Sequence, residues 1–168
     1  VVQDSMKTQA YETAEAFVEA GVARLVPLIS KVGGLDAIAG MGIGAPNANF
    51  YTGAIETAPD ITWAHERTVP LAKMFSEQLS SLDSRQKEPF PVRITNDANA
   101  AAMGEMAYGA ARGMKNFIVI TLGTGVGSGI VINGQLVYGH DGFAGELGHV
   151  TMVRGKEGRA CGCGRTGC

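Results

Sequence analysis

All three cysteines of the chain fall within its last eight residues, at Cys161, Cys163 and Cys168. With His149 they supply one imidazole and three thiols, a known ligand set of closed, tetrahedral zinc sites. An odd, clustered set of cysteines argues against a disulfide framework. Three free thiols or a strained disulfide are the alternatives, and a redox site is disfavoured because no Cys-x-x-Cys pair opens a helix. We therefore predict a structural Zn²⁺ held by these four side chains.

A second chemical group lies just upstream, in the segment Gly145-Glu-Leu-Gly-His149. Glu146 and His149 are three residues apart, so their side chains share one face on a helical turn. Such a pair can bind a polar ligand, and one member can serve a metal as well. The alternative is an exposed glutamate beside a histidine that is satisfied within the fold.

Asp97 stands between an expected strand, Val92 to Thr95, and an alanine-rich helix that reaches about Ala111. Crevices outside the carboxyl ends of strands are where α/β folds place their sites. A carboxylate there can accept a proton from a substrate hydroxyl. Asn and Asp are also favoured N-cap residues, so capping is the alternative. Both roles are filled if Asn96 caps the helix and Asp97 points into a cleft.

Glycine occupies every second position from Gly123 to Gly129, with threonine, valine and serine between. Backbone N–H groups of such a loop can close on phosphate oxygens, and hydroxyl groups add donors. The segment is neither a Walker A loop, since Gly-Lys-Ser/Thr is missing, nor a Rossmann fingerprint, since no helix follows at once. A glycine-rich strand turn without a ligand is the alternative.

The elements that must position these groups follow from periodicity and turn residues. Residues 47–68 have no clean period and are expected to be irregular, with a short strand near 53–56; polar residues 80–89 are expected to form a surface connection. The expected regular elements are a helix over 8–29 ended by Gly33-Gly34, strands over 38–43, 92–95 and 117–122, helices over 69–79 and 97–111, and a hairpin over 127–138 with a type I′ turn at Asn133-Gly134. This order predicts an α/β protein.

Composition excludes several classes of protein. The 168 residues are 45% hydrophobic and 18% charged, which is globular, and the net charge of −2 does not suggest binding of nucleic acid by bulk charge. No apolar run approaches the roughly 20 residues of a membrane span, and no secretory signal opens the chain. The absence of an initiator methionine and the end inside the cysteine cluster lead us to expect part of a longer protein.

Taken together, these motifs resemble the ROK family of sugar kinases and sugar-responsive repressors, and most closely its bacterial glucokinases. The resemblance rests on five segments in the family's order, over about three-quarters of the chain: Gly42-Ile-Gly-Ala-Pro46, Asn96-Asp-Ala-Asn-Ala-Ala101 with Gly104-Glu105, Thr121-Leu-Gly-Thr-Gly-Val-Gly127, Ala144-Gly-Glu-Leu-Gly-His149 and Cys161-Gly-Cys-Gly-x-x-Gly-Cys168. It implies an α/β, actin-like (ribonuclease H-like) sugar-kinase fold that is incomplete here. Residues 1–95 would be the remainder of the N-terminal lobe and 96–168 the start of the C-terminal lobe.

The resemblance also implies roles for residues. Asp97 matches the catalytic base that takes a proton from a hexose hydroxyl as that oxygen attacks the γ-phosphate of Mg²⁺-ATP. The other implied groups are the sugar-binding residues Asn96, Glu146 and His149, the second phosphate loop with Gly123, Thr124, Gly125 and Gly127, and the zinc ligands His149, Cys161, Cys163 and Cys168. The zinc would brace the sugar-binding loop. The implied activity is phosphorylation of glucose or a close relative on its 6-hydroxyl, in carbohydrate metabolism and glycolysis, by a cytoplasmic homodimer.

Two other functions remain open. A repressor of the same family would sense a sugar and carry a helix-turn-helix upstream, and only then would nucleic acid be a partner. A zinc hydrolase needs an open coordination position, which four protein ligands would close. The family's first phosphate loop, Asp-x-Gly-Gly-Thr, is absent, so we expect this stretch alone to be catalytically incompetent. Asn47 stands where many relatives have glycine, which bears on sugar preference.

Overall fold

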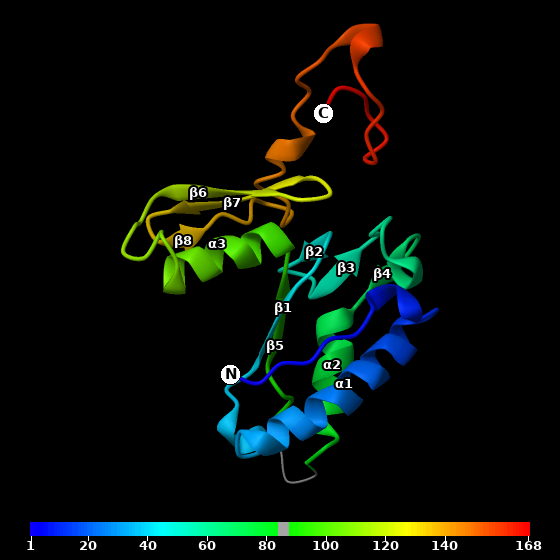
Figure 1. Ribbon diagram of the computed structural model, residues 1–168, viewed down its shortest axis with the longest axis vertical. Helices are drawn as coiled ribbons and strands as arrows, with labels where there is room; N and C mark the ends of the chain where they lie inside the picture. Colours follow the sequence, from blue (N-terminus) through cyan, green and yellow to red (C-terminus); the bar gives the residue numbers. More distant parts are fainter. Residues whose placement is uncertain (84–87) are drawn as a thin grey trace. The chain divides into compact units, whose positions relative to one another are not determined.

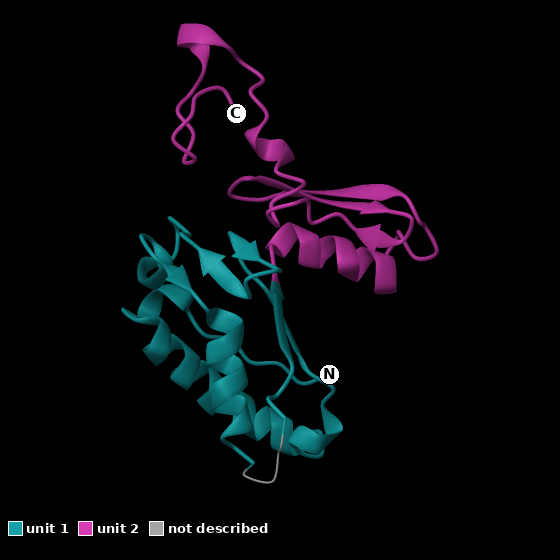
Figure 2. Ribbon diagram, turned by 180° about the vertical axis from the view of Figure 1, so that it is seen from behind, with its two compact units in different colours: residues 1–94 teal, residues 95–168 magenta. Residues whose placement is uncertain are grey.

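The computed structural model describes residues 1–83 and 88–168, and the chain divides into two compact units, Val1–Ile94 and Thr95–Cys168 (Figures 1 and 2). The surface connection expected over residues 80–89 lies partly outside the described residues. Assignment of the two units to the lobes of a kinase stays a prediction. Each unit has its own elements and is described separately.

The first unit is built on helix α1 (Ala14–Lys31), which begins where Thr13 caps it. The hydroxyl of Thr13 accepts a hydrogen bond from the backbone N–H of Ala16, 3.2 Å away. The helix was expected from Thr8, but Thr8–Ala10 forms a separate 3₁₀ turn because the cap at Thr13 sets a new start. Its end agrees with the prediction, since Gly33 and Gly34 both adopt positive φ, a conformation that glycine tolerates.

Helix α2 (Leu71–Ser80) packs against α1 and closes the core of this unit. Phe17 of α1 stacks on Trp63, with ring centroids 4.8 Å apart, and meets the Phe75 ring of α2 edge-on. The Phe75 ring also lies against Gly21, where a Cβ atom would approach it to 3.3 Å. The two helices can therefore approach closely only because α1 carries no side chain at that position.

The strands of the first unit form two small sheets. Strand β1 (Met41–Gly44) pairs with β5 (Val92–Thr95). Strands β2 (Ala48–Asn49), β3 (Ala54–Glu56) and β4 (Thr68–Val69) form an antiparallel sheet. The expectation that 47–68 is irregular apart from one strand was thus wrong, because two-residue strands are too short to show a period of two. The strand expected over 38–43 is shorter and begins at Met41.

The second unit is a helix laid on one face of a three-stranded sheet (Figure 1). Helix α3 (Asp97–Tyr108) precedes β6 (Phe117–Leu122), β7 (Val126–Ile132) and β8 (Gln135–Leu136), which pair in that order as antiparallel strands. Asn133 and Gly134 have φ values of 54° and 77°, as the predicted type I′ turn requires. These predicted elements are confirmed, with α3 ending at Tyr108 rather than near Ala111.

Side chains along β6 alternate between a covered and an open face. The face toward α3 carries residues such as Val119, whereas the opposite face exposes large apolar side chains. The exposed members on β6 and β7 are Ile118, Ile120, Leu122, Val126 and Ile132. After β8 the chain forms only short 3₁₀ turns (Leu147–His149 and Gly155–Glu157) and a bridge between Ala160 and Thr166.

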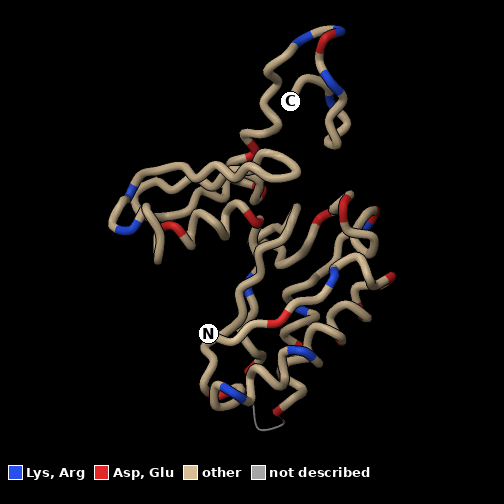
Figure 3. The backbone as a smooth tube through the Cα atoms, in the orientation of Figure 1, with Lys and Arg blue, Asp and Glu red and all other residues tan. Residues whose placement is uncertain are grey.

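Charge is distributed unevenly along the second unit (Figure 3). Its last fifteen residues carry four basic side chains and one acidic one: Arg154, Lys156, Arg159, Arg165 and Glu157. Among the described residues, none of the helices combines the length and apolarity that crossing a bilayer requires.

Candidate active site and metal centre

The corner between β5 and α3 holds Asn96 and Asp97. Asn96 is the N-cap of α3, and its Oδ1 accepts from the Ala98 backbone N–H at 2.8 Å. Asp97 Oδ1 accepts from the same N–H, also at 2.8 Å. Asp97 is exposed, so its carboxylate is accessible, whereas the next residue, Ala98, is buried and anchors the start of α3. Asn96 caps α3 as expected, whereas the expectation that Asp97 points into a cleft stays a prediction.

Two buried oxygens flank this corner. Among the described residues, Thr95 Oγ1 and Asn99 Oδ1 are buried side-chain atoms without a hydrogen-bond partner. Buried oxygens of this kind are commonly satisfied by an ordered water. The corner is therefore polar below the surface as well as on it.

The alternating glycines divide into two groups with different surroundings. At Gly127 a Cβ would lie 3.0 Å from Ala98 Cβ, and at Gly129 it would lie 2.8 Å from the Ala98 carbonyl oxygen. These two glycines let α3 lie directly on β7. Gly123 and Gly125, in the turn that joins β6 to β7, have nothing within 4 Å of such an atom. Packing thus explains Gly127 and Gly129, whereas the space around Gly123 and Gly125 leaves their backbone open to close approach.

The segment before His149 lies against the start of β7. Gly145 has a φ of 93°, and its carbonyl accepts from the hydroxyl of the buried Ser128. A Cβ on Gly148 would collide with the Val126 carbonyl. Consecutive residues of β7 therefore contact both α3, through Gly127, and the 145–149 loop, through Val126 and Ser128. These contacts could not be inferred from the residue pattern.

Glu146 and His149 face each other at the 3₁₀ turn Leu147–His149. The carboxylate Oε2 of Glu146 lies 4.0 Å from Nε2 of His149, and both side chains are roughly two-fifths exposed. The predicted shared face is present, although it belongs to a single 3₁₀ turn. A carboxylate acceptor and a ring N–H donor side by side suit a ligand with several hydroxyl groups.

The other nitrogen of His149 faces the cysteines. Its Nδ1 lies 3.6 Å from Cys161 Sγ, and Cys163 Sγ lies 3.7 Å from Cys168 Sγ. One ligand atom from each of the four residues lies within 4.8 Å of the others. In a tetrahedron with Zn–S of about 2.3 Å and Zn–N of about 2.0–2.1 Å, the S–S edge is about 3.8 Å and the S–N edge about 3.5 Å. The donor set and these two separations fit Zn²⁺.

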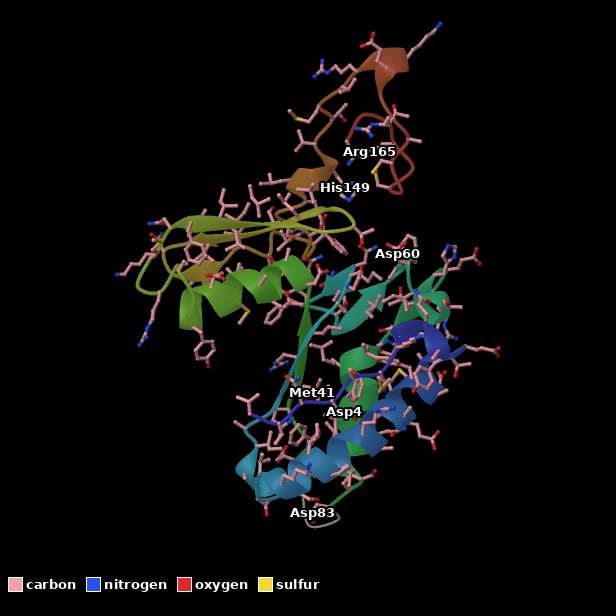
Figure 4. All side chains as sticks on the ribbon, viewed as in Figure 1. Asp4, Met41, Asp60, Asp83, His149 and Arg165 are labelled. Carbon is pink, nitrogen blue, oxygen red and sulfur yellow. The ribbon has the colours of Figure 1, made fainter. Side chains whose placement is uncertain are left out.

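Arg165, which sequence reasoning missed, organises this cluster. Its guanidinium donates to the His149 carbonyl oxygen at 2.9 Å, and Figure 4 labels both residues, which belong to different segments of the chain. Hydrogen bonds from its backbone N–H and side chain lower the pKa of the Cys163 thiol to about 6. Desolvation, followed by the neighbouring thiols Cys163 and Cys161, raises the pKa of Cys168 to about 11. Cys163 is thus a thiolate at neutral pH, and Cys168 needs a cation to lose its proton.

A model of the ROK family matches residues 2–168. The chain belongs to the ROK family. A glucokinase from Halalkalibacterium halodurans is 45% identical over 130 residues, which cover 77% of this chain and 36% of the relative. A xylose repressor from Caldicellulosiruptor bescii is 36% identical over 132 residues, which cover 78% of this chain and 30% of the repressor.

The solved structures of ROK proteins agree with the expected fold. A ROK family glucokinase from Streptomyces griseus, crystallised with glucose and AMPPNP, matches with a TM-score of 0.72 at 37% identity. The match covers 94% of this chain and 45% of the crystallised one, so the chain spans less than half of that relative. The prediction of an α/β, actin-like sugar-kinase fold, present here in part, is confirmed.

Proposed function

We propose that the protein containing this chain transfers the γ-phosphoryl group of ATP to a hexose. The observation that carries the proposal is Asp97, exposed at the start of α3, whose neighbour Ala98 packs on Gly127 at the base of the glycine hairpin. This contact ties a candidate base to a candidate phosphate loop. Glucose and AMPPNP in the S. griseus glucokinase crystal support both ligands.

The reaction uses Asp97 as a general base. Its carboxylate accepts the proton of the hexose 6-hydroxyl while that oxygen bonds to the γ-phosphorus, and the bond from phosphorus to the bridging oxygen of ADP breaks. Mg²⁺ on the phosphates would neutralise the developing charge on the leaving group. Backbone N–H groups at Thr124 and Gly125 would contact the phosphates. The Gly123 N–H donates to the Gly125 carbonyl oxygen at 3.0 Å and would hold the turn in shape, and Gly127 would set the base of the loop.

The sugar would be oriented by three side chains. Asn96 uses its Oδ1 for the cap of α3, which leaves its Nδ2 to donate to a hydroxyl. Glu146 can accept from hydroxyl groups, and His149 Nε2 can donate to them. A base and a phosphate cradle held on rigid elements accelerate transfer mainly by positioning.

Zinc would act outside the chemistry. Bound by Cys161, Cys163, Cys168 and Nδ1 of His149, it would fix the ring and direct Nε2 toward Glu146 and the sugar. Four protein ligands leave no open position for catalysis, so we assign the ion a structural role.

The test is ADP release by the full-length protein with Mg²⁺-ATP across a panel of hexoses, with Asp97→Asn beside it. We expect sugar-dependent release that falls by about 10²–10⁴-fold in the variant, as loss of a general base predicts. Equal zinc content and melting temperature establish that both proteins are folded. Absence of sugar-dependent release, or full activity of Asp97→Asn, would reject the proposal.

A second candidate function is sugar-dependent repression, favoured by the similarity to the C. bescii xylose repressor. The same sugar-binding residues would then report a ligand without phosphorylating it. Sugar-dependent binding of operator DNA without ADP release would identify this function. Homodimer formation and a cytoplasmic location stay predictions, which light scattering and cell fractionation of the full-length protein can check.

A further inference from the structure

The Ala98 backbone N–H donates to two side chains at once. Asn96 Oδ1 and Asp97 Oδ1 each lie 2.8 Å from it. An N-cap residue ordinarily supplies one acceptor for an orphan N–H of the first turn, so a single acceptor would be sufficient here. The second acceptor is the carboxylate that the proposed reaction requires.

Release of the carboxylate therefore has a specific consequence. Asp97 must turn away from Ala98 to reach a substrate hydroxyl. Ala98 is only 1% exposed, so water does not readily replace a lost acceptor. Asn96 remains bonded to the N–H when Asp97 leaves, and no buried donor is left unpaired.

We infer that Asn96 is a positioning residue that frees Asp97 for catalysis by keeping the Ala98 N–H hydrogen-bonded. This inference rests on the proposed kinase function and adds a role for Asn96 beyond sugar contact. Without Asn96, Asp97 becomes the sole acceptor and is held at the helix terminus, away from the hydroxyl. The expected effect is on the chemical step, separate from the affinity for sugar.

Three full-length variants separate the two roles of Asn96. Asn96→Ser keeps a capping oxygen but removes the amide donor to sugar, and Asn96→Ala removes both. The KM for hexose should rise alike in the two variants, whereas kcat should fall about tenfold further in Asn96→Ala than in Asn96→Ser. Asp97→Asn is measured alongside. Rapid-quench single-turnover measurements ensure that the chemical step is followed.

Thr13→Ala is the matched control for general loss of a cap. Thr13 caps α1 through the Ala16 N–H, and its substitution should lower stability without changing kcat.

Should Asn96→Ala not fold, Asn96→Gly removes the acceptor while keeping a residue tolerated at the cap. Equal kcat in Asn96→Ser and Asn96→Ala, with Asp97→Asn inactive, would overturn this inference and leave the kinase intact. Full activity of Asp97→Asn would instead overturn the proposed function.

Discussion

His149 and Cys161 lie with Nδ1 and Sγ 3.6 Å apart, while the other ring nitrogen of His149 faces Glu146. The imidazole thus joins the cysteine cluster to the loop proposed to bind sugar. A carboxylate near the second nitrogen of a metal-bound histidine is a common way to orient the ring. Metal binding and sugar binding should therefore be linked through this one side chain.

Removal of the metal should lower the affinity for sugar more than the affinity for ATP. We expect one Zn²⁺ per chain by atomic emission, and its loss by chelation should raise the KM for hexose more than the KM for ATP. His149→Gln should contain less than one zinc ion per chain, because only three of the four ligands remain. His140→Gln, at a fully exposed histidine outside the cluster, should retain the metal. Full zinc content in His149→Gln would contradict the assigned ligand set.

The metal-free thiols should react at different pH. Arg165 lowers the pKa of Cys163 to about 6, so its alkylation rate should rise between about pH 5 and 7 and then level off. Cys168, with a pKa of about 11, should still be gaining reactivity above pH 9. The pKa of Cys163 is lower in the folded state than in the unfolded chain, where it is near 9. The thiolate therefore contributes to stability above about pH 9, and this contribution is lost as pH falls through about 6.

Peptide mapping after brief iodoacetamide treatment distinguishes the three cysteines. Arg165→Lys keeps a charge but not the forked guanidinium, and should shift the Cys163 profile to higher pH. Zinc-loaded protein should be protected throughout. Identical pH profiles for Cys163 and Cys168 would contradict the environment that the structure gives them.

Ser128→Ala tests the contact between β7 and the loop over residues 145–149, which is proposed to bind sugar. The buried Ser128 hydroxyl donates to the Gly145 carbonyl, and its loss should lower stability by about 1 kcal/mol. The KM for hexose should rise while the KM for ATP stays unchanged. Ser30→Ala removes a similar bond, from an exposed hydroxyl to the Val26 carbonyl, and should leave both KM values unchanged. An equal rise in both KM values in Ser128→Ala would show that the loop does not act selectively on sugar.

Residue types with strong local preferences made much of the second unit predictable. Asn96 caps α3, Asn133-Gly134 dictates the turn, and the clustered cysteines meet His149 in a group that could hold a metal ion. Local preference is weak where pairing creates the element, as in the two-residue strands β2 and β4. The start of α1 was misplaced because Ala10 continues the helical spacing of Ala14 and Phe17, which the Thr13 cap interrupts.

Contacts across the fold could not be predicted from one sequence. The glycine repeat suggested one function, yet the structure gives its members two different surroundings. Gly127 meets Ala98, which is 29 positions earlier, and that meeting depends on how α3 lies on the sheet. Arg165 likewise acts through a loop closure that its neighbours in sequence do not reveal.

Alanine substitutions at Gly125 and Gly127 should separate phosphate binding from packing. Gly127→Ala places a methyl group 2.7 Å from Thr121 Oγ1 and 3.0 Å from Ala98 Cβ, so stability should fall by about 1–3 kcal/mol. The methyl group of Gly125→Ala would have nothing within 4 Å, so this variant should have the same melting temperature as the parent protein. If the Gly125 backbone approaches a phosphate, the added methyl should instead raise the KM for ATP about tenfold, the loss expected for one charge-assisted hydrogen bond.

The double variant Gly127→Ala with Ala98→Gly supplies the control for packing. The second substitution removes the contact with Ala98 Cβ, which is one of the two close contacts, so part of the lost stability should return. Such non-additive effects are typical of residues in direct contact. Denaturant unfolding and ATP-dependent kinetics of the full-length protein report the two effects separately. If Gly125→Ala left the KM for ATP unchanged, the turn of the hairpin would not be a phosphate loop, and Gly127 would serve only to let α3 pack on β7 beside Asp97.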